Sequence, residues 1–162
     1  MVSVDGTDFV MNEPEPFDPK WNSHKFKKAA LKYEVTISIQ TCDIVMVNGP
    51  FPGSVNDLVI FRNGLKRFLS LLERVDADSG YKDVKCSTPG DYNTIEEKLQ
   101  KGRVLARHEN INARFKGWRI LKDVYCHSIE DLGDVFRAVA YVTQLELNHG
   151  RFKWHVRYTV NI

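Results

Sequence analysis

The sequence predicts a protein of the α/β class, in which helices flank a mixed sheet. Apolar side chains recur at every second position in 32–40 and form a short run in 44–47, as they do in strands. They recur at helical spacing in 57–72, 94–118 and 128–147. This order predicts a sheet that begins with a hairpin and then adds a strand by a parallel crossover.

Three of the expected strands come first in the chain. A short apolar run predicts a strand of which Asp5 is the last residue. In 32–40 the alternation puts Glu34 and the other polar residues on one side, so we expect a half-buried strand. The run 44–47 completes a hairpin. We expect it to end before Pro50, because a proline cannot donate a hydrogen bond to a ladder.

The remaining elements are mostly helices and loops. Asn56 or Ser54 can cap the first helix, and Ser128 with an acidic first turn begins the last one. In order, we expect an ordered loop at 11–24, a helix at 57–72, a strand at 73–78, a loop at 82–93, a helix at 94–118, a helix at 128–147 and a strand or arm at 151–159.

Composition narrows the class of protein. A chain of 162 residues with 43% apolar content can form one core, so we expect a single domain spanning 1–162. Its three cysteines form no CxxC pair, which argues against a zinc site and suits a reducing compartment. No run of about 18 apolar residues is present, so we expect no membrane span. The net charge of +2 is too small to indicate a polyanionic partner by itself.

Three acidic side chains stand where they can converge. Asp5 and Asp78 each follow an apolar run, and Glu109 lies on the helix at 94–118. Together they would offer the hard oxygen ligands that Mg²⁺ or Mn²⁺ prefers. Two such ions about 4 Å apart stabilise both the attacking and the leaving oxygen of a phosphodiester displacement. The sequence therefore indicates metal-dependent chemistry on a nucleic-acid backbone.

The helix that carries Glu109 has three faces at about 100° per residue. One stripe holds Glu109, Asn112 and Lys116. The stripe that we expect to face the core consists of Val104, Ile111, Phe115 and Trp118. The third is a basic ridge of Arg103, Arg107 and Arg114. Such a ridge suits the positioning of phosphates, although a solvated face with i,i+4 pairs explains it equally well.

Aromatic and basic residues also occur near the end of the loop at 11–24, where Trp21, His24 and Lys25 lie. Such residues can contact phosphates and bases, so one interpretation is contact with DNA. The interpretation that we favour is that they hold the loop against the sheet.

Nine short motifs occur in order along nearly the whole chain. They are Ser3–Phe9, Trp21–Lys25, Tyr33–Val35, Asn48–Pro50, Asn56–Leu58, Ala77–Tyr81, Ala106–Asn112, Arg114–Lys116 and Val135–Gln144. In order and spacing they resemble the catalytic domain of Harbinger (PIF)-type transposases, which are DDE superfamily endonucleases. The resemblance implies a ribonuclease-H-like mixed sheet flanked by helices.

The resemblance also implies roles for particular residues. Asp5, Asp78 and Glu109 match the catalytic carboxylates, which bind Mg²⁺ or Mn²⁺. Asp57 matches a further acidic position of the family and is a candidate fourth metal ligand. The interpretation that we favour is a helix cap or an acid in the first turn of a helix. The implied reaction is attack of water on a transposon-end phosphodiester, followed by attack of the released 3′-OH on target DNA. The implied partner is DNA, the implied location is the nucleus, and we expect DNA contacts from Arg103, Arg107, Asn112, Arg114 and Lys116.

One departure from the family pattern lies at the N-terminus. Family members carry a helix-turn-helix-like region ahead of this domain, whereas Asp5 is nearly the first residue here. We therefore expect a truncated domain that recognises DNA sequence weakly, or through a separate DNA-binding protein. The main alternative is a catalytically inactive, domesticated or fragmentary transposase remnant that binds DNA or protein. A small ribonuclease or junction resolvase on the same fold also remains open, and the sequence predicts no oligomeric state.

Overall fold

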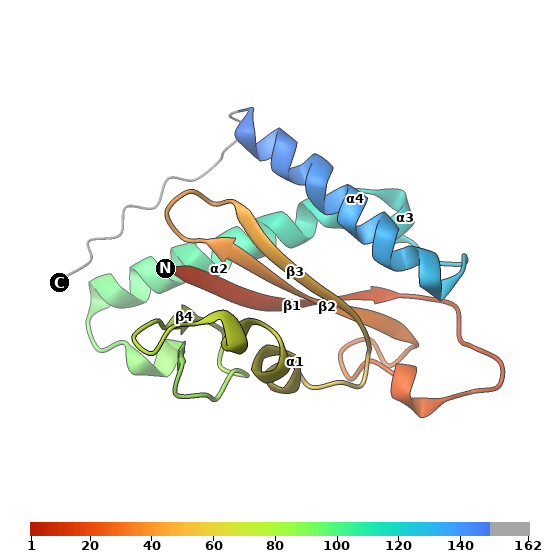
Figure 1. Ribbon diagram of the computed structural model, residues 1–162, viewed down its shortest axis with the longest axis horizontal. Helices are drawn as coiled ribbons and strands as arrows, with labels where there is room; N and C mark the ends of the chain where they lie inside the picture. Colours follow the sequence, from red (N-terminus) through yellow and green to blue (C-terminus); the bar gives the residue numbers. More distant parts are fainter. Residues whose placement is uncertain (150–162) are drawn as a thin grey trace.

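Helices cover both faces of a five-stranded sheet in the computed structural model, which describes residues 1–149 (Figure 1). The strand order is β3-β2-β1-β4-β5. Antiparallel pairing joins β1 to β2 and β2 to β3, whereas β4 runs parallel to both β1 and β5. The strands are β1 (Val2–Val10), β2 (Ala30–Ser38), β3 (Ile44–Pro52), β4 (Val75–Asp76) and β5 (Cys86–Ser87). The α/β class, the hairpin and the parallel crossover are confirmed, and the sheet has the ribonuclease-H-like arrangement.

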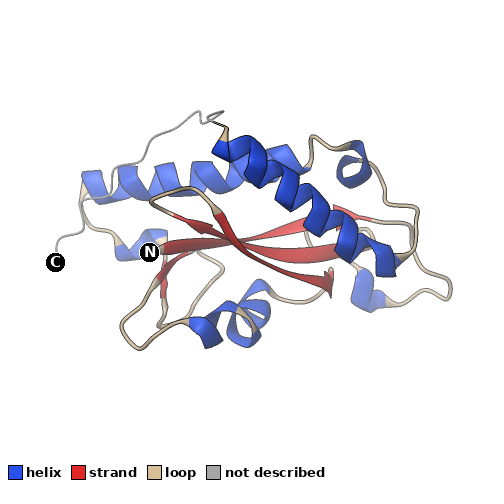
Figure 2. Cartoon of the chain, turned by 45° about the horizontal axis from the view of Figure 1, so that its top comes forward, coloured by secondary structure: helices blue, strands red, loops and turns tan. Residues whose placement is uncertain are grey.

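Two long helices and two short ones complete the layers (Figure 2). They are α1 (Asp57–Asn63), α2 (Ile95–Phe115), α3 (Arg119–Lys122) and α4 (Ile129–Asn148), with 3-10 turns η1 (Pro19–Trp21), η2 (Leu65–Phe68) and η3 (Pro89–Asp91). One core cluster joins α2 and α4 to the sheet, and Phe136 of α4 stacks there on Tyr33 of β2 with ring centroids 4.0 Å apart. A second cluster joins α1 and η2 to the other face, around Val4, Phe61 and Tyr81.

The helices begin where the capping residues predict. The Asn56 side chain accepts a hydrogen bond from the Leu58 N–H at 2.9 Å, so Asn56 rather than Ser54 caps α1. Thr94 and Glu97 form a capping box at the start of α2, and Ser128 caps α4. The expected helix at 57–72 is shorter than predicted, because α1 ends at Asn63 and only the 3-10 turn η2 follows Gly64.

Asp5 lies inside its strand, so the prediction that it ends the strand is wrong. In the register of β1 and β2, Asp5 is opposite Val35 and the pairing continues to Val10. Gly6 continues the strand, and its lack of a side chain lets Asp57 approach the backbone of β1. A Cβ at this position would lie 2.6 Å from Oδ1 of Asp57.

Two predictions about the hairpin are also wrong. β2 is a central strand covered on both faces, so Glu34 is only 1% exposed and the strand is not half-buried. β3 does not end before Pro50 but continues to Pro52. The prolines are tolerated because β3 is the edge strand, and within residues 1–149 no strand pairs with its outer side.

Some smaller elements differ from the sequence-based expectation. The expected loop at 82–93 contains β5 and η3, and Trp118 is 41% exposed rather than part of the core. The strand or arm expected at 151–159 lies outside the described residues. No helix within residues 1–149 combines the length and the apolar character that crossing a membrane requires.

Candidate metal and nucleic-acid site

The pairing of β1 with β4 brings Asp5 and Asp78 together. Val2 is opposite Val75 and Ser3 is opposite Asp76 in this parallel pair. Two residues beyond the pair of Ser3 and Asp76, the same register reaches Asp5 and Asp78. Because side chains alternate along a strand, these two lie on the same face of the sheet as Ser3 and Asp76. Asp78 follows β4 in a turn, and its Oδ1 accepts a hydrogen bond from the Gly80 N–H at 2.8 Å. The two aspartates therefore come from neighbouring strands.

Helix α2 lies along this same face, as three side-chain contacts demonstrate. The Nζ of Lys101 is 3.6 Å from Oδ1 of Asp76, and Nε2 of His108 is 2.7 Å from Oγ of Ser3. Farther along, Nδ2 of Asn112 donates to Oδ2 of Asp5 at 3.1 Å. The helix thus runs in the direction of β1, and the exposed Glu109 is on the same side of the sheet as Asp5.

The carboxyl group of Asp5 lies in an unfavourable electrostatic environment. Burial, then repulsion by Asp78 and by Asp57, raise its pKa from 3.8 to about 6, against the lowering effects of the Gly6 N–H and of Lys25. The Gly6 N–H donates to Oδ1 of Asp5 at 2.9 Å. A cation bound beside Asp5 and Asp78 would relieve this repulsion.

The donors near Asp5 fit a hard cation in chemical type. Both carboxylates offer oxygen, and Oδ1 of Asn112 is a buried amide oxygen for which residues 1–149 supply no hydrogen-bond donor. Among these same residues, however, no three His, Cys, Asp or Glu side chains lie close enough together to hold a metal ion. Register and side-chain contacts thus bring together two aspartates and the Asn112 amide.

Asp57 is the first residue of α1 and has a partner of its own. Its Oδ1 lies 3.1 Å from Nζ of Lys32, which also donates to the Val55 carbonyl at 2.9 Å. Asp57 is thus an acid in the first turn of a helix, held by a lysine, and its charge also contributes to the raised pKa of Asp5.

The expected basic ridge on α2 is not a continuous exposed surface. Arg103 is exposed, but Arg107 is 6% exposed and its guanidinium donates to the carbonyl of Ile39. Arg114 pairs with Glu146 at 3.4 Å and donates to Asn110. The burial of Arg107 was not foreseen because the periodicity of a helix does not reveal which polar side chains another segment will cover.

Lys116 caps the C-terminal end of α2 and lies near the acidic pair. Its Nζ is 5.8 Å from the centre of the Phe9 ring and 5.5 Å from that of Phe26. Its pKa is lowered by burial and by Lys25, while Asp8 and Asp5 act in the opposite direction. Lys116 and Lys25 are therefore close enough to Asp5 to act on its charge.

A cluster of lysines follows η1, and of these only Lys25 was considered above as a possible DNA contact. From 19 to 33 the chain holds five lysines and no acidic residue, a signal that was visible in the sequence. Ser23 is fully buried and donates to Oδ2 of Asp8 at 2.5 Å, which fixes this loop against β1.

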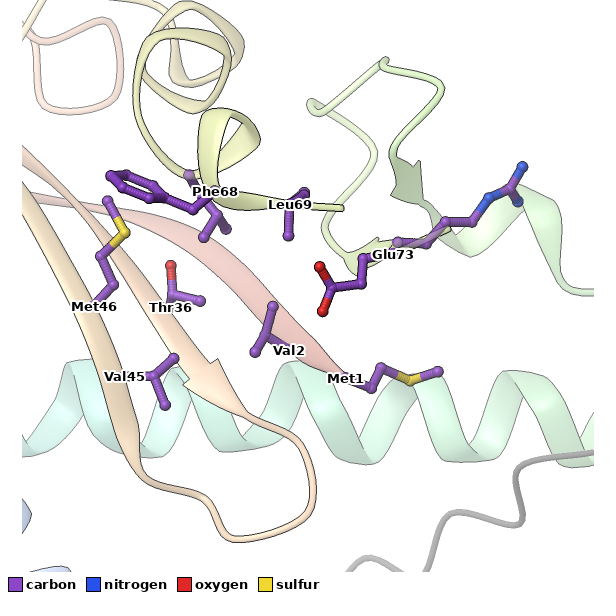
Figure 3. Close-up of a pocket in the computed structure, with 10 residues that line it drawn as sticks. Met1, Val2, Thr36, Val45, Met46, Phe68, Leu69 and Glu73 are labelled. Atoms are coloured by element: carbon purple, nitrogen blue, oxygen red, sulfur yellow. The ribbon is translucent and has the colours of Figure 1, made fainter. Parts of the chain in front are cut away.

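A pocket of about 480 Å³ lies elsewhere, on the α1 face of the sheet (Figure 3). It is lined mainly by apolar side chains, among them Val2, Met46 and Leu69. None of the residues predicted to bind metal or DNA lines it. The pocket is therefore separate from the acidic pair.

Comparison with known proteins gives one match. The family model described as DDE superfamily endonuclease matches residues 4–144. No curated protein and no solved structure matches the chain.

Proposed function

Because the chain belongs to the DDE superfamily endonuclease family, we propose that it is a divalent-metal-dependent DNA endonuclease or transposase domain that uses Asp5, Asp78 and Glu109. The observation that supports this most is the register of β1 and β4, which leads to Asp5 and Asp78 on the face of the sheet along which α2 carries Glu109. The finer assignment to the Harbinger (PIF) type, the nuclear location and a separate DNA-binding partner protein are parts of the same proposal.

The chain's own residues would hold and orient the ligands. Asp5 and Asp78 would bind Mg²⁺ or Mn²⁺, and Glu109 would join them from α2. When bound, such a cation neutralises charge at the phosphorus and activates the attacking oxygen. Asn112 and the Gly6 N–H hold the two oxygens of Asp5, and the Gly80 N–H holds one oxygen of Asp78. These contacts fix the direction in which each carboxylate presents its free lone pairs.

We propose a structural role for Asp57, since Lys32 already pairs with its carboxylate. Among the expected DNA contacts we retain Arg103, Asn112, Arg114 and Lys116. We leave Arg107 out because its side chain is buried.

The test is nicking of supercoiled plasmid DNA in the presence of Mn²⁺. We expect each of Asp5→Asn, Asp78→Asn and Glu109→Gln to lower the rate by more than about 100-fold, since electrostatic groups in reaction centres contribute on this order. Glu96→Gln is the matched control, because Glu96 is an exposed glutamate in the first turn of the same helix. Nicking that survives Asp78→Asn combined with Glu109→Gln would refute the assignment.

A second candidate is a catalytically inactive remnant that binds DNA or protein. The observation in its favour is that Glu109 is exposed and that residues 1–149 contain no assembled group of three metal-binding side chains. A chain that folds by circular dichroism but binds no Mn²⁺ in calorimetry would support this candidate over the enzyme.

A further inference from the structure

The loop between β1 and β2 presents cations that form no direct ion pair among the described residues. Lys25, Lys27 and Lys28 are exposed, and within residues 1–149 no carboxylate lies within 4.0 Å of their ammonium groups. By contrast, Lys20 and Lys32 at the two ends of this basic segment pair with Asp18 and Asp57. Exposed cations that no carboxylate contacts directly are available to an external anion.

This loop is held in one conformation by its own hydrogen bonds. Oγ of the buried Ser23 donates to Asp8 and accepts from the N–H groups of Lys25 and Phe26, at 3.2 and 3.3 Å. The Ser23 N–H donates to the Lys28 carbonyl, and the Lys27 N–H donates to the Ser23 carbonyl, both at 2.9 Å. A surface already fixed in this way loses little conformational entropy when it binds a partner.

The loop also lies near Lys116 at the end of α2, the helix that contacts Asp5. The ammonium groups of Lys25 and Lys116 lie 5.9 and 5.5 Å from the centre of the same Phe26 ring. Two like charges held around one ring repel each other, and a phosphate between them would remove that repulsion. Lys116 lies one helical turn beyond Asn112, whose Nδ2 donates to Oδ2 of Asp5 at 3.1 Å.

We propose that the loop of residues 20–28 is the surface that holds the DNA backbone beside Asp5 and Asp78, through Lys25, Lys27 and Lys28. This inference depends on the proposed function for its choice of DNA as the polyanion. It assigns to this loop the phosphate contacts that the sequence analysis expected from a ridge on α2. Such contacts position a duplex without reading its sequence.

The experiment measures how the affinity for duplex DNA depends on salt, by fluorescence anisotropy in EDTA, so that no cleavage is required. Each lost phosphate contact lowers the slope of log K against log salt by about 0.9, so Lys25→Gln, Lys27→Gln and Lys28→Gln combined should lower it by about 2.7. The matched control changes three exposed cations on other elements, Arg67→Gln, Lys98→Gln and Lys122→Gln, with the same change in net charge. We expect the control to alter the slope by less than about 1.

The possible results separate this inference from the proposed chemistry. If the loop variant has the wild-type slope, or if its slope changes by no more than that of the control variant, the inference is overturned. This holds even if the chain nicks DNA with Mn²⁺. A large loss in the loop variant alone supports it, even if nicking is never seen. A wild-type chain that does not bind duplex DNA overturns both. Because all three loop lysines are exposed, we expect an unchanged thermal midpoint, which circular dichroism verifies.

Discussion

Glu34 provides the most quantitative test of the structure. It lies in the central strand β2, is 1% exposed and faces the α1 layer. Burial raises its pKa from 4.5 to about 7, against the lowering effects of the Asn48 side chain and the Leu65 N–H. The substitution Glu34→Gln keeps the shape of the side chain and removes the charge.

The sign and size of the effect follow from these two pKa values. Between pH 4.5 and about 7 the folded chain binds a proton at Glu34 that the unfolded chain has released, so the free energy of unfolding falls as the pH rises. A pKa difference of this size corresponds to about 3 kcal/mol, at about 1.4 kcal/mol for each tenfold change in proton affinity. Below pH 4.5 Glu34 no longer lowers the free energy of unfolding, and above about pH 7 the full decrease is present. Glu34→Gln should therefore stabilise the protein at pH 8 and leave its stability nearly unchanged at pH 4.

The assay is urea unfolding of the wild type and the variant in EDTA at several pH values between about 4 and 8. Comparing the two proteins at each pH isolates Glu34, since Asp5 also has a raised pKa and makes the wild type less stable at high pH. Glu130→Gln, at an exposed position, is the matched control. A stability difference between Glu34→Gln and wild type that does not change with pH would refute the reasoning.

Two further predictions concern the site and one surface cluster. Asn112→Leu removes the hydrogen bond to Asp5, so we expect its Mn²⁺ affinity in calorimetry to fall by about 10-fold or more, whereas Asn110→Ala on the same helix should leave it unchanged. Equal affinities of these two variants would contradict the role of Asn112. Asp83 binds Arg62 at 3.0 Å and Lys66 at 2.8 Å, and although burial acts to raise its pKa, Lys66, the Lys85 N–H and Arg62 lower it to about 2. The contribution of Asp83 to the free energy of unfolding is present above pH 3.8 and is lost as the pH falls toward 2. Asp83→Asn should therefore lower the free energy of unfolding by about 1–2 kcal/mol at pH 7 and by almost nothing near pH 2, as measured by urea unfolding.

Local patterns in the sequence were enough to predict much of the fold. The hairpin followed from period-two alternation, and the two long helices followed from apolar stripes, with Ser128 as the predicted cap of the last one. The capping box of Thr94 and Glu97 was not predicted. These features depend on residues that are neighbours in the chain. For the same reason, the start of each helix was predicted better than its burial.

The errors concern contacts between distant segments. Glu34 looks like a solvent-facing residue until α1 and η2 are known to cover its face of the sheet. Arg107 looks exposed until the carbonyl of Ile39 is placed against it. The two-residue strand β5 exists only because β4 pairs with it. Alternation and helical spacing do not contain this information.

The candidate site was predicted to a similar extent. The three acidic positions came from motifs and their family resemblance, and these do not give distances. The adjacency of Asp5 and Asp78 depends on the register of β1 against β4, which are separated by more than sixty residues of chain.

The prolines of β3 determine how the sheet can grow. Neither Pro50 nor Pro52 has an N–H to offer an incoming chain, and at the opposite margin β5 is only two residues long. Both margins are therefore poor templates for strand addition. Copies of this protein should resist joining edge to edge into larger aggregates, even when they are concentrated on the same nucleic acid.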